Sequence, residues 1–375
     1  MDYALQKTIS LLLLILIGVL LKLKFKNPDE ITGLKKIILN LALPATIFMA
    51  LLKIEISKEL ALLPIIAILL NFLLFALAGF LLPVVGISKN SPEGRTSRLL
   101  IPSLAPGLSC FPFVLEFLGD DYLAKAAMAD LGNKIFVLIV LYIIAMKWFY
   151  KNNSEKIKQV DNSKKIKDLL LSMVKEPVNL FIISALVLVL FGVNLSMFPS
   201  FFKDVFSRLS VIMTPLILIF IGLAFKIKRR QFLQIFALLL LRAGIVLMLM
   251  AGLVLLFDIP QNENVLLLVA FALSACSFWP FAHISMVDAA EKNKEATSKT
   301  FSNSFAIGIL ALSLPISTLL ILAILSSGEV FTSPFNLVTL GVLCCFGAVF
   351  SVLCKSIKIP KQVSSSKELF RKSTT

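Results

Sequence analysis

Eleven apolar stretches, each long enough to cross a lipid bilayer as a helix, follow one another along the 375-residue sequence. A spanning helix needs about 20 mostly apolar residues. Because 58% of the residues are apolar and only 16% are charged, this surface cannot be buried in one water-soluble core. We therefore predict an all-α polytopic membrane protein. The expected spans are Ala4–Leu23, Ile31–Leu52, Leu60–Gly86, Ser97–Leu118, Tyr122–Tyr150, Pro177–Val193, Lys203–Lys226, Gln231–Phe257, Val265–Val287, Lys299–Leu325 and Phe335–Leu353.

Several other classes are excluded by the distribution of charge and motifs. The net charge of +15 does not indicate a nucleic-acid partner, because the basic residues lie in short loops where they set membrane topology. The run Ile9–Leu21 is followed by lysines instead of a cleavage site, so we expect a retained first span. With one histidine and no Cys-x-x-Cys, HExxH, GxSxG or Walker A motif, we predict no metal site, no cofactor and no enzyme.

The orientation follows from lysine and arginine, which gather on the cytoplasmic side of membrane proteins. Loops after even-numbered spans carry few of them. Loops after odd-numbered spans and the C-terminal tail carry Lys22, Lys24, Lys26, Lys89, Arg95, Arg98, the whole 151–176 loop, Lys228, Arg229, Arg230, Lys292, Lys294, Lys358, Lys361, Lys367, Arg371 and Lys372. We therefore predict an N-terminus outside the cell membrane and a cytoplasmic C-terminus.

The 151–176 loop is the one long polar stretch. Within it Ile166, Leu169, Leu170, Met173 and Val174 share one helical face, with lysines around them. This pattern is typical of a short amphipathic helix that lies on the membrane surface.

Five local features recur in the same order, one in each of five consecutive spans. The pairs are Gly18-Val19 with Gly192-Val193, Pro44 with Pro215, Asn71 with Arg242, Pro112 with Pro280, and Asn133 with Asn303. Each repeat has five spans, so the second copy enters from the opposite side, as in many secondary transporters. We predict a ten-helix inverted repeat of residues 1–150 and 177–326, followed by an additional helix and basic tail in 327–375.

The fourth and ninth spans are expected to be broken and to cross. The fourth contains Ser109 and Pro112, and the ninth contains Ser277 and Pro280 in equivalent places. A proline within a helix removes a backbone donor, and interrupted spans at equivalent positions indicate a substrate site in transporters. Simple proline kinks without a site are the alternative.

Arg242 is the second indication of a site. It follows Arg230 by twelve residues, which places it about 18 Å deep in a helix with a 1.5 Å rise per residue. A charge at that depth needs a partner or serves a function. The partner is either the substrate or, in a structural role, Glu116 or Asp130.

Four further polar positions belong to the candidate site. Lys134 lies one turn after Asp130, so the two either neutralise each other or leave Lys134 for a substrate. His283, three residues after Pro280, is a proton or substrate ligand or a packing residue. Asn133 and Asn303 are included because they occupy corresponding places in the two repeats.

The sequence resembles the auxin efflux carrier family of membrane transporters over residues 1–326. The resemblance lies in Gly18–Lys22 with Leu39–Phe48, in Gly107–Phe113 with Phe117–Gly119, and in Pro215–Ala224. It implies a fold related to bile-acid sodium symporters, with spans 1, 2, 6 and 7 as a scaffold and spans 3–5 and 8–10 as a moving part. It also implies elevator-type transport of small organic anions and a homodimer formed through scaffold helices 2 and 7.

The resemblance adds Ala105, Gly107 and Cys110 to the candidate substrate site. Family members carry an Asn-Thr-Gly segment where this chain has Ala105-Pro106-Gly107, and a glycine where it has Cys110. These departures and the eleventh helix favour the rival hypothesis, a non-transporting sensor or regulatory membrane protein with the same fold. The first hypothesis remains a secondary transporter of a small organic anion.

Overall fold

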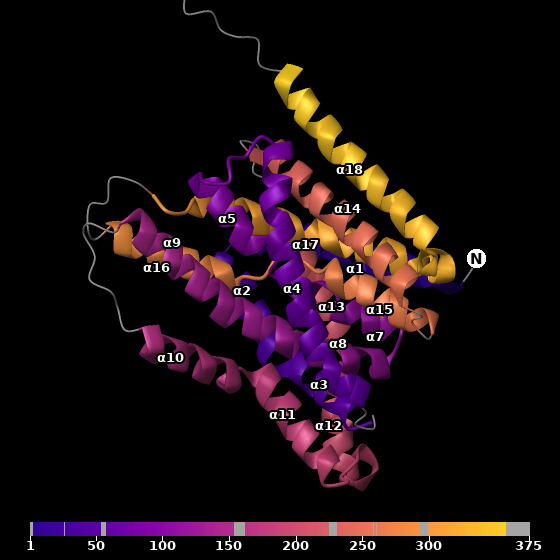
Figure 1. The fold of residues 1–375 in the computed structure, drawn as a ribbon. Helices are drawn as coiled ribbons and strands as arrows, with labels where there is room; N and C mark the ends of the chain where they lie inside the picture. Colours follow the sequence, from indigo (N-terminus) through magenta and orange to yellow (C-terminus); the bar gives the residue numbers. More distant parts are fainter. Residues whose placement is uncertain are drawn as a thin grey trace, which may run out of the picture.

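The structure is a computed structural model that describes residues 3–25, 27–53, 58–153, 162–224, 231–257, 259, 261–292 and 299–357. Within these ranges all regular secondary structure is helical and no strand occurs (Figure 1). The first half of the chain forms α1 (Tyr3–Leu21), α2 (Pro28–Ile37), the π-helical turn η1 (Ile38–Ala42), α3 (Leu43–Leu51), α4 (Lys58–Val84), α5 (Pro92–Leu100), α6 (Pro106–Ser109), α7 (Phe111–Phe117), α8 (Asp120–Ile135), the π-helical turn η2 (Phe136–Val140) and α9 (Leu141–Asn152).

The second half begins with a helix that the amphipathic pattern predicts, α10 (Asn162–Lys175). The others are α11 (Pro177–Leu190), the 3-10 helix η3 (Leu195–Met197), α12 (Ser200–Val211), α13 (Met213–Ala224), α14 (Phe232–Leu256), α15 (Asn262–Ala272), α16 (Trp279–Lys292), α17 (Asn303–Ser326), the 3-10 helix η5 (Gly328–Thr332) and α18 (Pro334–Ile357). Leu170 and Val174 of α10 are exposed, while the side chains of Ile166 and Met173 lie outside the described residues.

Seven helices of the described residues are long and apolar enough to cross a membrane. They are Asp29–Leu51, Leu60–Val84, Asp120–Asn152, Ser200–Ala224, Phe232–Leu256, Asn303–Ser326 and Pro334–Ser351. Of the four remaining expected spans, two are the shorter apolar helices α1 and α11, and two are interrupted, α5–α7 and α15–α16. The basic positions Lys26, 228–230, Lys294 and 358–375, used for the orientation, fall outside the described ranges, as does the side chain of Lys292.

The sequence predicts interruptions caused by prolines within a helix, whereas the structure places these prolines at helix starts. Pro106 is the first residue of α6, and Pro112 and Pro280 are the second residues of α7 and α16. At these positions a helix has no hydrogen bond for the missing N–H to lose. The prolines therefore start the helices that follow the interruptions and do not break a helix from within. Pro44 differs, because it is the second residue of α3 but lies within the continuous helical stretch Asp29–Leu51, directly after η1.

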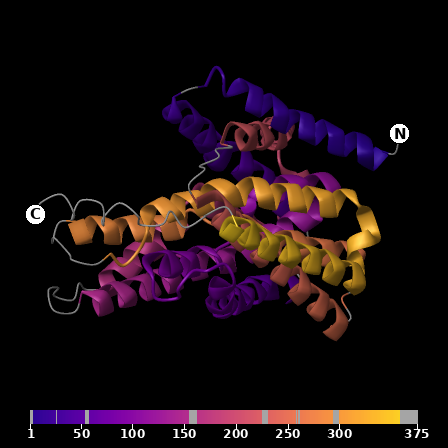
Figure 2. The same ribbon diagram turned by 90° about the horizontal axis from the view of Figure 1, so that it is seen from above.

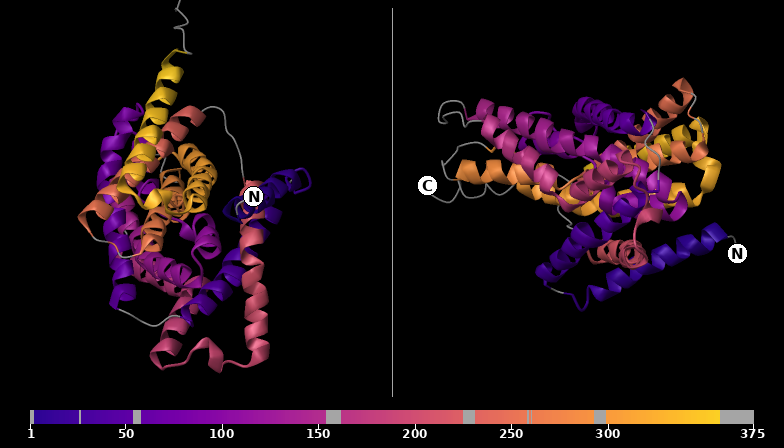
Figure 3. Two further views of the ribbon diagram at one scale, coloured as in Figure 1. Left: turned by 90° about the vertical axis from the view of Figure 1, so that its right-hand side faces the viewer. Right: turned by 90° about the horizontal axis from the view of Figure 1, so that it is seen from below.

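The helices form two groups that lie beside each other. In one, α1 packs on α13, and α3 packs on α11 and α12. In the other, α4 packs on α8, α14 on α17, and α9 on α16. Figures 2 and 3 show the first group on one side of the molecule, with indigo α1 and α2 next to the rose-coloured helices of α12 and α13. The last helix, α18, runs along α14 and joins the second group (Figure 1).

Glycines permit the closest helix contacts within each group. A Cβ atom on Gly132 of α8 would overlap the carbonyl oxygen of Pro64 in α4. Gly18 and Gly222 bring α1 and α13 together, and Gly244 and Gly341 do the same for α14 and α18. Small residues at such crossings let helix backbones approach in a bilayer, where packing rather than hydrophobicity drives association.

We expect Gly132→Ala to destabilise the protein by about 1–3 kcal/mol, the usual cost of forcing a methyl group into a close-packed contact. Thermal unfolding of purified protein in detergent measures this. The control is Gly252→Ala in α14, whose Cβ would meet nothing within 4 Å; it should leave stability unchanged or raise it by up to about 1 kcal/mol. Equal unfolding temperatures for the two variants would contradict the assignment.

Candidate functional site

The two interrupted spans lie against each other at their interruptions. Residues 101–105, between α5 and α6, form what we call the first unwound segment, and residues 273–278, between α15 and α16, form the second. The Ala105 N–H donates to the Ala275 carbonyl oxygen at 2.8 Å, and the Ser277 N–H donates to Ser103 Oγ at 3.1 Å. The sequence-based expectation that the fourth and ninth spans are broken and adjacent therefore agrees with the structure.

Serine hydroxyls take the place of the helical hydrogen bonds that the unwound segments lack. Ser109 Oγ accepts from the Ala275 N–H and donates to the Ala105 carbonyl oxygen, both at 2.9 Å. Ser313 Oγ of α17 accepts from the Cys276 N–H at 3.3 Å. A bilayer tolerates irregular backbone only where protein groups satisfy it. These hydroxyls thus make the unwound segments possible.

The side-chain amide of Asn133 in α8 bonds to the first unwound segment as a backbone peptide group would. Its Nδ2 donates to the Leu104 carbonyl oxygen at 2.9 Å, and its Oδ1 accepts from the Leu104 N–H at 3.2 Å. Asn71 of α4 supports it by donating from Nδ2 to the same Oδ1 at 3.0 Å. Both asparagines are buried, so the amide is held in one orientation.

Arg242 of α14 joins the two unwound segments. Its side chain is 3% exposed. The Nε–H donates to the Ile101 carbonyl oxygen at 3.0 Å, and Nη2 donates to the Ser274 carbonyl oxygen at 2.8 Å. One guanidinium therefore contacts both segments at once, through backbone oxygens.

Glu116 and Asp130, the acids that the sequence suggests as partners for Arg242, form ion pairs with other residues. Glu116 lies 3.5 Å from Lys7 of α1, and Asp130 lies 3.4 Å from Lys134. Among the described residues no ion pair involves Arg242. The hypothesis of a carboxylate partner was wrong, because it considered only side chains.

Lys134 forms the local pair with Asp130 that the spacing predicts, and two further contacts that it does not. Its Nζ lies 3.2 Å from Glu176 Oε2 and donates to Asn179 Oδ1 at 2.8 Å. Glu176 and Asn179 stand at the start of α11, in the other group of helices. The ion pair thus connects the two groups at a place where Lys134 and Asp130 are both buried.

His283 is a packing residue in this structure. It is 4% exposed and its Nε2 lies 3.2 Å from the Val137 carbonyl oxygen in η2. Its ring also meets the Tyr142 ring edge-on, with centroids 5.5 Å apart. These contacts place His283 between α16 and the η2–α9 region, and not in the unwound segments.

Asn303 is also separate from the unwound segments. It is the first residue of α17, and its Nδ2 donates to Asp288 Oδ2 at 2.8 Å. The contact that Asn133 makes in the first half is made in the second half by Ser313, which bonds to Cys276. The sequence repeat pairs Asn133 with Asn303 because the residue types agree. In the structure the counterpart of Asn133 is Ser313, because it makes the equivalent contact with the second unwound segment.

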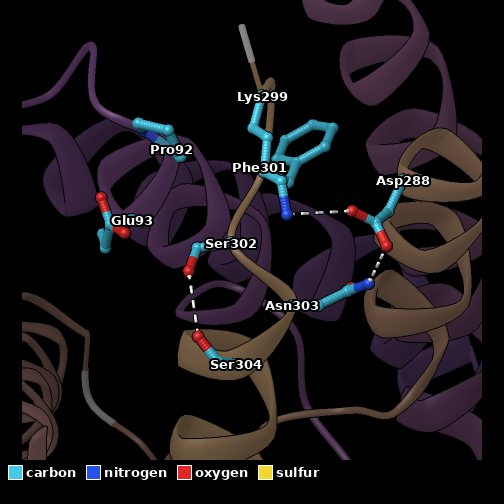
Figure 4. Close-up of a pocket in the computed structure, with 8 residues that line it drawn as sticks. All are labelled: Pro92, Glu93, Asp288, Lys299, Phe301, Ser302, Asn303 and Ser304. Carbon is cyan, nitrogen blue, oxygen red and sulfur yellow. Dashed lines mark hydrogen bonds and ion pairs between the residues drawn. The ribbon is translucent and has the colours of Figure 1, made fainter. Parts of the chain in front are cut away.

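Asn303 lines a cavity of about 340 Å³ between the starts of α5 and α17 (Figure 4). The lining residues are Pro92, Glu93, Asp288, Lys299, Phe301, Ser302, Asn303 and Ser304. Figure 4 shows Lys299 and Asn303 both directed at Asp288, with the Lys299 ammonium 3.8 Å from its carboxylate. Two carboxylates and one ammonium make this cavity a poor environment for an organic anion.

Lys35 is a charged residue near the unwound segments that sequence reasoning missed. It belongs to α2, and its Nζ lies 4.8 Å from the centroid of the Phe278 ring, which directly precedes α16. Within the described part of the chain Lys35 takes part in no ion pair. An ammonium group thus lies against Phe278, the residue that precedes the N-terminal, partly positive end of α16. No sequence signal marked it, because a single lysine near the start of a span is ordinary.

The comparisons with known proteins add one relative. No protein-family model matches the sequence. The chain is 28% identical over 228 residues to a protein of Methanocaldococcus jannaschii named as an uncharacterized transporter. The aligned region is 59% of this chain and 68% of the relative.

We expect Lys134→Met to destabilise the protein, because it leaves the carboxylates of Asp130 and Glu176 without their ammonium partner. Removing one member of a buried ion pair costs about 3–5 kcal/mol. Adding Glu176→Gln should recover part of this loss, with a coupling of about 1–3 kcal/mol. Unfolding of the single and double variants in lipid nanodiscs measures the coupling.

The matched control is Lys147→Met on α9, where the lysine side chain is exposed. It should unfold like the unaltered protein. Additive effects of Lys134→Met and Glu176→Gln would show that the contact between α8 and α11 does not contribute to stability.

Proposed function

We propose that the chain is a secondary membrane transporter that moves a small organic anion by an elevator-type movement. The seven apolar helices and the similarity to a named transporter support an integral membrane transporter in general. The observation that carries the finer proposal is the contact between two unwound segments in the interior of the helix bundle. Paired interruptions of this kind form the substrate sites of many secondary transporters.

The contacts between the segments support a ten-helix inverted repeat. In one contact the backbone of Ala105 bonds to Ala275, and in the other the backbone of Ser277 bonds to Ser103. The two contacts are equivalent under the repeat. Ala275 follows Ser103 by 172 residues, and Ser277 follows Ala105 by the same number, so each contact joins a position in one segment to the counterpart of the other position. Reciprocal contacts at one constant spacing are what a two-fold relation between the repeats 1–150 and 177–326 produces.

The two groups of helices support a division into scaffold and moving part. The scaffold comprises α1, α2–α3 and α11–α13, and a second copy of the chain binds to its outer face through the second and seventh spans. The moving part comprises α4–α9 and α14–α17, with α18 attached to α14. Close glycine contacts lie within each group, so that each moves as one body, and the ion pair of Lys134 with Glu176 lies between them.

The charge near the unwound segments supports an anionic substrate. Lys35 from the scaffold faces the N-terminal end of α16 in the moving part. A carboxylate between them is attracted by a full positive charge and by the partial charge of the helix end. We also assign Ala105, Gly107 and Cys110, the positions that the family resemblance adds, to this substrate site.

We expect the N-terminus to be outside and both the 151–176 loop and the C-terminal end to be cytoplasmic, because lysine and arginine are concentrated there. Reporter fusions within this loop and after Thr375 should both give a cytoplasmic signal. Signals on opposite sides of the membrane are incompatible with the six spans expected between the two places, and an external signal at both would reverse the predicted orientation.

Uptake into proteoliposomes over a panel of small carboxylates tests the function itself. Accumulation of at least one anion, lowered about tenfold or more by Lys35→Gln, is the expected result, since a hydrogen bond between charged groups contributes about 1.5–3 kcal/mol. Lys36→Gln is the control, because Lys36 is exposed on the same helix and its removal should leave uptake unchanged. Folded protein that transports none of the anions would favour the sensor hypothesis.

A further inference from the structure

The environment of Arg242 is made of carbonyl oxygens at the ends of two helices. The Ile101 carbonyl is at the C-cap of α5, and the Ser274 carbonyl belongs to the residue after Leu273, the C-cap of α15. Each is 2.8–3.0 Å from the guanidinium. Both helices point their C-terminal ends at one cation from opposite halves of the chain.

The charges in this environment balance without any acidic side chain. The C-terminal end of a helix carries a partial charge of about −0.5. Two such ends supply about −1, which compensates the +1 of the guanidinium. This explains how Arg242 is buried although no carboxylate in the described part of the chain pairs with it.

Carbonyl oxygens at the C-terminal ends of interrupted helices are a typical environment for a coupling cation in transporters. Here the positive charge is covalently attached to the protein. An arginine keeps its charge throughout the physiological range, and the guanidinium cannot leave the chain.

We infer that the carbonyl oxygens of Ile101 and Ser274 form a monovalent-cation site that Arg242 fills with its own guanidinium. The protein therefore needs no dissolved cation to hold the two unwound segments together. Removing the side chain exposes a site that takes a guanidinium ion or a monovalent metal ion. This inference goes beyond the proposed function and stands on the contact between the segments alone, so its test measures stability and does not require transport.

Arg242→Ala, purified in detergent, is the test variant. Loss of the guanidinium leaves two buried carbonyl groups without donors, and we expect the unfolding temperature to fall by roughly 5–10 °C. Guanidinium chloride at about 5–20 mM, far below denaturing concentrations, should recover at least half of the fall. Choline chloride at equal ionic strength should not. The unaltered protein should respond to neither salt.

Arg242→Met is the matched control, because methionine removes the charge but fills much of the same space. It should lose stability as Arg242→Ala does and gain nothing from guanidinium. The inference is overturned if guanidinium fails to stabilise Arg242→Ala, if it stabilises Arg242→Met equally, or if the unaltered protein is stabilised by sodium over choline.

If Arg242→Ala does not fold, Arg242→Lys and Arg242→Gln decide the question. The two side chains are of similar length and differ in charge. We expect Arg242→Lys to give at least threefold more folded protein in size-exclusion chromatography, because the helix ends require a positive charge. Equal yields would show that the site does not bind a cation.

Discussion

The architecture depends on satisfying the backbone of two unwound segments inside a helix bundle. A continuous helix bonds its own peptide groups, but residues 101–105 and 273–278 cannot do so. Their partners come from the opposite segment, from serine hydroxyls, from the Asn133 amide and from the Arg242 guanidinium. An unpaired peptide group in hydrocarbon costs several kcal/mol, so each of these side chains is required by the same physical constraint.

Buried charge is balanced in two different ways near these segments. The Arg242 guanidinium is compensated by the ends of two helices, with no acid at all. The Lys134 ammonium is compensated by two carboxylates, one on its own helix and one from the neighbouring group of helices. The first arrangement joins the two unwound segments, and the second joins α8 in one group of helices to α11 in the other group. A movement between the groups must therefore break the second arrangement and can leave the first intact.

The same distinction separates the two positively charged side chains that contact the unwound segments, Arg242 and Lys35. Arg242 uses its donors on the protein itself, whereas Lys35 contacts only an aromatic face in the described structure. An aromatic face attracts a cation weakly, by about 0.5–2 kcal/mol. A carboxylate replaces that contact with a stronger one, which makes Lys35 the better candidate for binding an anion.

The sequence by itself determined the helices and the places where they are interrupted. Long apolar runs form helices in a bilayer, and the prolines at 106, 112 and 280 favour a first helical turn or a break. Proline alone does not decide this, because Pro64, Pro83 and Pro315 lie inside helices of the same structure. The i, i+4 spacing likewise predicted the pair of Asp130 and Lys134. These features depend on neighbours in the chain, and local physical chemistry is sufficient for them.

Only the tertiary structure decided which groups meet. The partners of Arg242 are backbone carbonyls, which every residue carries and which no sequence pattern distinguishes. Glu176 reaches Lys134, and Lys35 reaches Phe278, across more than forty and more than two hundred residues of chain. Asn303 looked equivalent to Asn133 by residue type, but it is the first residue of α17 and bonds to Asp288. The side chain that bonds to the second unwound segment is that of Ser313. Contacts between distant segments depend on how helices are placed in space, and that placement is a property of the whole bundle.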